Sequence, residues 1–178
     1  RDGKISHMLT VQHRMHEEIM RFPSATWYDG KLTAHPSVAS STLASGGPVY
    51  DVVDTAGAGF DESAKGEEDA SKENEGEANV VALVVKALVE EDGVATEDIG
   101  VVTPYSAQRA RLQTALSDLV EAGLEVDSVD GFQGREKVVI VFCAVRSNAD
   151  GDVCFLADER RLNVALTRAK KKLVVIGD

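Results

Sequence analysis

Runs of apolar, mostly β-branched residues recur along the chain, and each run has the length of a β-strand. The runs show little alternation with polar residues, which is typical of strands buried on both faces of a sheet. The predicted strands are 49–53 (VYDVV), 99–103 (IGVVT), 124–129 (LEVDSV), 137–144 (KVVIVFCA) and 173–176 (LVVI).

Helical patterns fill the intervals between these runs. The predicted helices are 77–91, 106–122 and 158–169. Alternating strands and helices predict an α/β fold, with a mostly parallel sheet flanked by helices. In such folds ligands gather at the carboxyl ends of the strands, so the loops that follow the strands are the first places to look for a site.

Two regions depart from this alternation. Residues 12–32 (QHRMHEEIMRFPSATWYDGKL) predict a helix, a break at Pro23, and a short aromatic-rich helix that ends at Asp29-Gly30. The acidic stretch 57–76 contains four glycines and no apolar periodicity, so we expect a mobile loop there.

Composition fits one soluble domain over residues 1–178, with 43% hydrophobic residues. No run reaches the length of a membrane span, and the first residues lack the layout of a signal peptide, so we expect an intracellular protein with no membrane partner. Cys143 and Cys154 have no metal-type spacing and are expected to be unpaired thiols in a reducing compartment. Because the chain begins without Met, we expect it to be a fragment of a longer protein.

The net charge of −11 argues at first against a polyanionic partner. The charge is unevenly distributed, however. Residues 54–79 hold nine acids against two lysines, whereas residues 130–178 hold nine bases against seven acids. Overall acidity therefore does not exclude a local phosphate site.

The loop between the strands at 124–129 and 137–144 has the residue types of a nucleotide or phosphate contact. It contains Gly131 and Gly134, together with Asp130, Gln133 and Glu136. Two glycines within four positions permit unusual backbone geometry and close approach to a ligand. An ordinary tight connection between strands would use the same residue types.

A second candidate is the segment that follows the strand at 99–103. Thr103 ends the strand, Pro104 prevents its continuation, and Ser106 is expected to cap the next helix. Free N–H groups at that helix start, together with Tyr105, form a plausible seat for a nucleic-acid phosphate. By itself this signal is weak.

Two further patterns limit the possible chemistry. His13, His16 and Glu17 fall on the predicted helix, but their spacing does not match H-E-x-x-H or its inverse, so we predict no metal site. No G-x-x-x-x-G-K-[ST] pattern occurs in the sequence. The chain therefore cannot act alone as a P-loop ATPase.

The final segment, RRLNVALTRAKKKLVVIGD (160–178), places Arg168 beside an apolar helical face and directly before a strand. One interpretation is a solvated basic helix end, because cations suit helix C-termini. The alternative is that Arg168 leaves the helix to meet a ligand. The segment alone does not decide between them.

Four stretches taken together resemble, in order and spacing, the C-terminal half of the Upf-one-like helicases of superfamily 1. They are LTVQHRMHEEIMRFPSATWYDGKL, VVTPYSAQ, VDSVDGFQGREKVVIVFCAVRSN and the final segment. VDTAGAGFDE and SKENEGEAN are most similar to the branch that contains the immunoglobulin mu-binding helicase. The resemblance implies the second, C-terminal RecA-like domain of an ATP-driven helicase, a P-loop NTPase-type fold, with the P-loop in a domain further upstream.

The resemblance also implies residue roles. Arg14 and Arg168 would reach the ATP γ-phosphate as arginine fingers. The roles implied for the remaining site residues are nucleotide contact for His13, Gln133, Gly134 and Glu136, and contact with a single strand for Thr103, Pro104, Tyr105 and Ser128. His13 departs from the family pattern, which usually has Tyr there as a stacking platform for adenine.

These observations predict one half of an ATP-dependent DNA or RNA helicase or translocase. Its cofactors would be ATP and Mg²⁺, and Mg²⁺ would be held mainly by the upstream domain. Its partners would be single-stranded nucleic acid and the N-terminal RecA-like domain. Two alternatives stay open: a catalytically silent RecA-like nucleic-acid-binding module, and half of a helicase–nuclease fusion.

Overall fold

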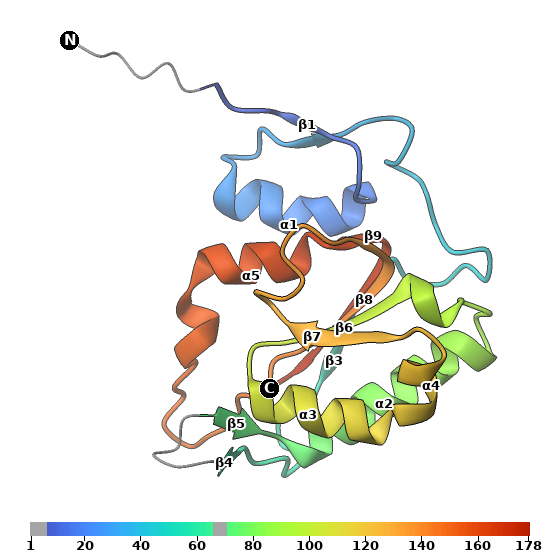
Figure 1. Ribbon diagram of the computed structural model, residues 1–178. Helices are drawn as coiled ribbons and strands as arrows, with labels where there is room; N and C mark the ends of the chain where they lie inside the picture. The colour runs from blue at the N-terminus through green and yellow to red at the C-terminus, as the bar shows by residue number, and fades with distance from the viewer. Residues whose placement is uncertain (1–6, 66–70) are drawn as a thin grey trace.

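A parallel sheet of five strands forms the centre of the molecule (Figure 1). The computed structural model describes residues 7–65 and 71–178. The strand order is β3-β9-β8-β6-β7, and each neighbouring pair is parallel, which confirms the predicted sheet. The strands are β3 (Tyr50–Asp54), β6 (Ile99–Thr103), β7 (Glu125–Ser128), β8 (Lys137–Cys143) and β9 (Ala169–Gly177).

Helices cover both faces of this sheet. In Figure 1, α1 and α5 lie above the sheet, while α2, α3 and α4 lie below it. Successive residues of a strand point to opposite faces, so Ile140 and Phe142 join the upper core, and Val139 and Val141 join the lower one. The helices are α1 (Glu17–Trp27), α2 (Glu75–Glu90), α3 (Ser106–Ala115), α4 (Ser117–Glu121) and α5 (Glu159–Leu166). The short 3-10 helices are η2 (Thr96–Asp98) and η3 (Cys154–Ala157).

The segment before α1 is a turn, so the helix predicted from residue 12 is wrong at its start. Gln12 ends β1 (Val11–Gln12), which pairs in parallel with β2 (Thr33–Ala34). Its side-chain oxygen accepts hydrogen bonds from the N–H groups of Arg14 and Met15, both at 2.7 Å. Amide side chains that bond to nearby backbone compete with helix formation, and here they leave Arg14 outside α1.

Two helix boundaries also differ from the prediction. One helix runs through Pro23, which is buried, where a break was expected. The helix predicted to end at 169 ends at Leu166, and β9 begins at Ala169. The strand takes these residues because β9 lies between β3 and β8 and pairs with both of them.

Part of the acidic segment forms a small hairpin where a loop was expected. β4 (Ser63–Lys65) pairs antiparallel with β5 (Ser71–Glu73), and residues 66–70 lie outside the described residues. The hairpin touches α3. The N–H of Ala107 donates to Ser71 Oγ at 2.9 Å, and Ser106 makes no side-chain cap. The predicted cap at Ser106 is therefore wrong, because a serine from another strand takes its place.

Among the helices of the described residues, none has the length and apolar character needed to cross a bilayer.

Candidate functional site

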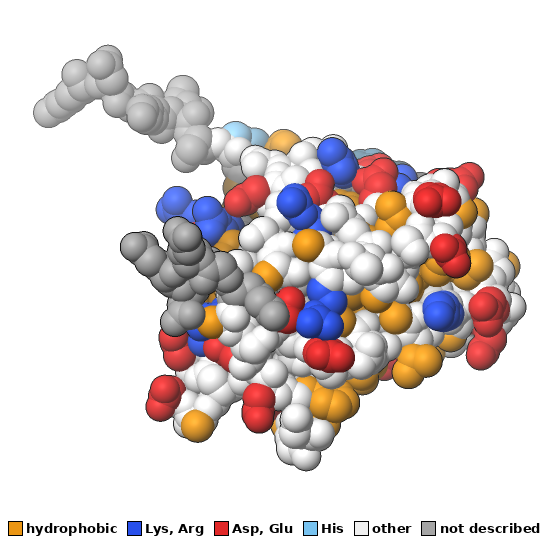
Figure 2. Space-filling view, turned by 60° about the horizontal axis from the view of Figure 1, so that its bottom comes forward, with side chains coloured by type: hydrophobic (Ala, Val, Ile, Leu, Met, Phe, Trp, Pro, Cys, Tyr) orange, Lys and Arg blue, Asp and Glu red, His pale blue; other side chains and the backbone are white. Residues whose placement is uncertain are grey.

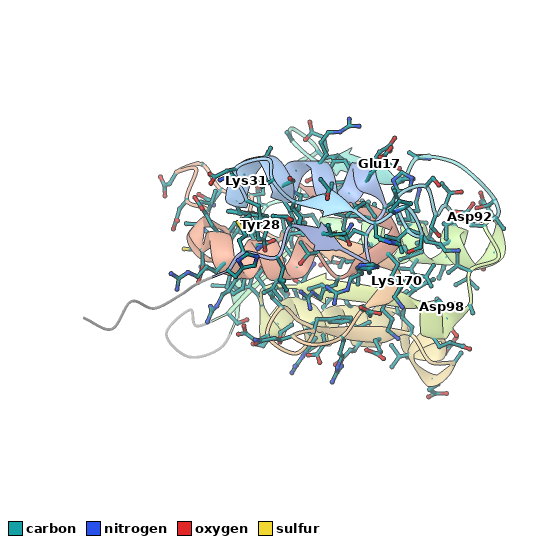
Figure 3. The ribbon with its side chains drawn as sticks, turned by 90° about the horizontal axis from the view of Figure 1, so that it is seen from above. Glu17, Tyr28, Lys31, Asp92, Asp98 and Lys170 are labelled. Carbon is teal, nitrogen blue, oxygen red and sulfur yellow. The ribbon has the colours of Figure 1, made fainter. Side chains whose placement is uncertain are left out.

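A cluster of charged side chains gathers where β8 and β9 begin. Arg14 Nε donates to Glu136 Oε2 at 2.6 Å, and Lys170 Nζ lies 3.0 Å from Glu136 Oε1. Lys170 is labelled in Figure 3, which views the molecule from this side. Hydrogen bonds from Arg14 and Lys170 lower the pKa of Glu136. The carboxylate therefore stays ionised and holds two cations in place.

Arg168 lies next to this cluster and is folded back on the end of α5. Its Nε donates to the carbonyl of Val164 at 2.9 Å, and its Nη2 donates to Thr167 Oγ1 at 3.2 Å. Burial and the nearby charge of Arg14 lower the pKa of Arg168. In this conformation the half-buried Arg168 satisfies a free carbonyl at a helix C-terminus and is not extended toward a ligand.

His13 and Arg14 line a shallow hollow of about 330 Å³ together with Gln12, Met15 and Glu136. The imidazole of His13 stacks on that of His35, with ring centroids 4.2 Å apart and an interplanar angle of 25°. One face of the His13 ring is therefore covered by His35, and His13 is exposed overall.

The glycine-containing loop between β7 and β8 leads to the same cluster. Gly134 is exposed and has a φ of +84°, a conformation that other L-residues rarely adopt. A Cβ atom on Gly131 would lie 2.4 Å from the carboxylate of Asp127, so this position has no room for a side chain. Gln133 is exposed on the turn between the two glycines. The loop is thus shaped by its glycines and leaves Gln133, Gly134 and Glu136 on the surface.

The residues predicted to contact a single strand lie at the other end of the sheet, where β6 and β7 finish. Thr103 is fully buried, and its hydroxyl has no hydrogen-bond partner among the described residues. Pro104 and Tyr105 are half-buried. Ser128 Oγ accepts from the N–H of Gly131 at 3.1 Å. A single strand of nucleic acid could reach Tyr105 directly. It could reach Thr103 only after the residues that cover Thr103 move.

A buried polar network supports this second end of the sheet, and sequence reasoning missed it. Glu77 is fully buried in the first turn of α2, and its carboxylate accepts the N–H of Val145 at 2.7 Å. Burial raises the pKa of Glu77. Cys143 donates to the same carboxylate at 3.3 Å, and burial raises the pKa of this thiol well above its ordinary value. Acidic residues are common in the first turn of exposed helices, so nothing in the sequence indicated that Glu77 is buried.

Lys170 and Arg146 were also missed as functional candidates. Lys170 belongs to a run of three lysines that resembles a solvated helix end, yet it pairs with Glu136. Arg146 lies in the quoted motif VRSN, which was the available signal, and its side chain is almost completely buried. Cys143 and Cys154 are both free thiols. In residues 7–65 and 71–178, no group of three or more His, Cys, Asp or Glu side chains could hold a metal ion.

The donors at the amino ends of β8 and β9 fit a polyphosphate. Arg14, Arg168 and Lys170 surround a single carboxylate, Glu136. Burial and the charge of Arg14 lower the pKa of Arg168, and the charge of Glu136 raises it. Guanidinium groups bind phosphate oxygens through planar, bidentate hydrogen bonds, so two such groups in one cluster suit a ligand with several phosphate oxygens.

Comparison with known proteins connects these features to helicases. The family model described as an AAA domain matches residues 1–178. The chain is 47% identical over 180 residues to the DNA-binding protein SMUBP-2 of Mesocricetus auratus, with 96% of this chain and 18% of that protein covered. It is 43% identical over 187 residues to the DNA polymerase alpha-associated DNA helicase A of Schizosaccharomyces pombe, with 96% and 27% covered.

A more distant relative is also named as a helicase, and a solved structure shares the fold. The ATP-dependent helicase NAM7 of Saccharomyces cerevisiae is 35% identical over 185 residues, with 99% of this chain and 19% of that protein covered. The chain thus spans between about a fifth and a quarter of the length of these relatives. The C-terminal domain of a possible DNA helicase from Lactobacillus plantarum WCFS1 superposes with a TM-score of 0.55 at 13% identity, covering 93% of this chain and 87% of that one, and shares the fold. The chain therefore has a RecA-like α/β fold and belongs to the Upf-one-like group of superfamily 1 helicases, within the family described as an AAA domain.

Proposed function

We propose that this chain is the second RecA-like domain, the C-terminal half, of an ATP-dependent DNA or RNA helicase or translocase. The observation that carries the proposal is the cluster of Arg14, Arg168 and Lys170 around the single carboxylate of Glu136. The relatives are named as helicases and as a DNA-binding protein, which supports the same activity here. ATP and Mg²⁺ are the cofactors, and the upstream N-terminal RecA-like domain holds most of their contacts.

Within this half of the nucleotide cleft, each side chain has a separate task. ATP supplies a γ-phosphoryl group on which negative charge grows during transfer. Arg14 and Arg168 stabilise that charge as arginine fingers. Glu136 holds Arg14 in place until the cleft closes. The geometry favours Arg14 as the preset finger, because Arg168 must first release the carbonyl of Val164.

The other proposed nucleotide contacts shape the cleft rather than react. The free face of His13 stacks on the base, while His35 supports the ring from behind. Gly134 lets the backbone approach the ligand closely, and Gln133 and Glu136 provide polar contacts beside it.

At the end of the sheet where β6 and β7 finish, four residues are assigned to contact with single-stranded nucleic acid: Thr103, Pro104, Tyr105 and Ser128. Tyr105 offers a ring for stacking, and Ser128 and Thr103 offer hydroxyl groups to phosphates. Contacts of this kind position a strand without reading its sequence, so the protein should bind single strands with little sequence preference. We further propose an intracellular location without a membrane role.

The test uses the chain alone and the chain joined to its upstream domain. Purified 1–178 should hydrolyse no ATP above background, because a Walker A pattern is absent from its sequence. The joined protein should hydrolyse ATP and respond to added single strand, and Arg14→Gln should lower turnover by roughly 10³-fold, as loss of an arginine finger does. A joined protein that binds strands but never hydrolyses ATP would instead identify a silent binding module.

A further inference from the structure

Three hydrogen-bond donors converge on one carboxylate oxygen directly after β8. Glu62 Oε2 accepts from Arg146 Nε at 2.7 Å, from the N–H of Ser147 at 3.1 Å, and from Asn148 Nδ2 at 3.4 Å. We call Arg146, Ser147 and Asn148 the β8 cradle. A guanidinium, a backbone N–H and a side-chain amide around one oxygen are the groups that proteins use to bind phosphate oxygens.

The backbone of this cradle is held in a strained conformation. Val145, the residue before it, has a φ of +74°, which is an outlier for a β-branched residue. The N–H of Val145 donates to Glu77 at 2.7 Å, and its carbonyl accepts from Asn74 Nδ2 at 3.3 Å. Both groups of the strained peptide are therefore fixed by α2 and its cap. Strain of this kind persists only where surrounding structure enforces it, and it is concentrated at ligand sites.

The cradle lies beside the residues proposed to contact a single strand. Arg146 Nη1 donates to the hydroxyl of Tyr105 at 3.4 Å. A hollow of about 150 Å³, which the three cradle residues help to line, opens next to it. Burial lowers the pKa of Arg146, but hydrogen bonds to Tyr105, Cys154 and Glu62 outweigh this effect and raise the pKa overall, so Arg146 itself stays charged. Two further carboxylates line the hollow: Asp152 lies 3.5 Å from Arg146 Nη2, and Asp178 accepts from Ser147 Oγ at 2.8 Å.

Figure 2 shows acidic and basic side chains interspersed over the face that lies at the bottom of Figure 1. A phosphate approaching such a surface is attracted by a specific set of donors rather than by a broad positive field.

We propose that the β8 cradle is a phosphate site for single-stranded nucleic acid, and that Glu62 occupies it as an internal competitor until a strand displaces it. That the ligand is single-stranded nucleic acid rests on the proposed function, whereas the phosphate site itself does not. The backbone N–H of Glu62 donates to the carbonyl of Ser147 at 3.2 Å. The side chain of Glu62 can therefore leave the cradle while the backbone of its segment stays attached.

The test compares Glu62→Gln with Asp61→Asn, which removes the same charge from the exposed neighbouring residue. Melting of each form of the chain is followed with and without inorganic phosphate. Phosphate should raise the Tm of Glu62→Gln and leave wild type and Asp61→Asn almost unchanged. If Glu62→Gln does not fold, Glu62→Asp serves the same comparison, because its carboxylate is one methylene too short to keep the 2.7 Å contact.

A second measurement uses a fluorescent oligo-dT of 15 nucleotides. Glu62→Gln should bind it about fivefold more tightly than wild type, at the lower end of typical coupling between competing sites. The slope of log K against log salt should be the same in wild type and Glu62→Gln, because the displaced Glu62 leaves the same phosphate contact in both. Adding Arg146→Gln to Glu62→Gln should remove the gain in affinity and make the slope shallower by about 0.7, the value for one lost single-strand phosphate contact.

The outcomes distinguish a phosphate site from a contact with single-stranded nucleic acid. If Glu62→Gln has a lower Tm than wild type, does not respond to phosphate and binds oligo-dT no more tightly, the inference is overturned and the ion pair is purely structural. A response to phosphate without any oligo-dT binding would support the cradle as a phosphate site but refute the proposed strand contact.

Discussion

Arg14 donates to Glu136 at 2.6 Å although 122 residues separate the two in sequence. The pair joins the turn before α1 to the loop before β8, and Arg14 Nη1 also donates to the carbonyl of Thr167 at 3.1 Å. Both side chains are partly exposed, at 32% and 42%, and therefore remain accessible to a ligand.

The stabilising effect of Glu136 should depend on pH. Its pKa is lowered in the folded chain, so it contributes stability above its ordinary value of 4.5 and loses that contribution as pH falls through the lower folded value. Urea unfolding at pH 6 should show Glu136→Gln less stable than wild type by less than about 1 kcal/mol, because exposed pairs are screened. The difference should shrink as the pH falls below 4.5. Glu121→Gln, on an exposed helix end, is the control and should show no such trend.

Replacing Arg168 should separate catalysis from stability. In the protein joined to its upstream domain, Arg168→Ala should lower ATP turnover by roughly 10³-fold. It should also cost about 1 kcal/mol of unfolding free energy, because the carbonyl of Val164 loses its partner. Arg168→Lys should restore little turnover, since an ammonium group cannot make planar, bidentate contacts. Lys171→Ala is the matched control, and equal turnover in both alanine variants would show that Arg168 is only a helix cap.

His13→Tyr should strengthen nucleotide binding in the joined protein. The ring already stacks on His35, and a larger ring keeps that contact while it offers more surface to the base. We expect a gain of about 0.5–1.5 kcal/mol, the usual range for aromatic pairs. Titration with a fluorescent ATP analogue at pH 8 measures it. If His13→Tyr and His35→Ala both bind the analogue like wild type, the stacked pair does not face the base.

Removing the buried carboxylate of Glu77 should destabilise the chain without touching its surface. Glu77→Ala leaves the N–H of Val145 without a partner, which should cost about 1–3 kcal/mol. Glu77→Gln keeps an acceptor. Because burial raises the pKa of Glu77, wild type should lose stability as pH rises through that raised value, whereas Glu77→Gln should not. Denaturant unfolding between pH 4 and pH 9 follows this, with the exposed Glu75→Gln as control. Parallel pH curves for wild type and Glu77→Gln would contradict it.

The sequence predicted the sheet well because strands buried on both faces are apolar without interruption. β6 was predicted at its observed bounds, and β8 to within one residue. β9 was predicted five residues too short, four of them at its start, because Lys170, Lys171 and Lys172 resemble a solvated helix end. Lys172 pairs with Val139 of β8, and its Nζ donates to the carbonyl of Pro48 at 2.7 Å; local pattern reveals neither contact.

The candidate site was predictable as residue types but not as geometry. Motifs identified Arg14, Arg168 and Glu136, yet nothing in the sequence indicated that Arg14 and Glu136 pair or that Arg168 folds back on α5. The turn that presents Arg14 depends on two backbone hydrogen bonds that one side-chain oxygen, that of Gln12, accepts. Such side-chain contacts depend on the positions of individual atoms, which a pattern of residue types does not specify.

The position of β8 has a mechanical consequence. Glu136 immediately precedes this strand and Arg146 follows it, and its seven residues span about 23 Å at about 3.3 Å per residue. Hydrogen bonds to β6 and β9 hold both edges of the strand, and Val139 to Cys143 are almost completely buried. A strand held on both sides does not move alone. A pull on Glu136 would therefore be shared with β6 and β9 as well as passed along β8 toward Arg146.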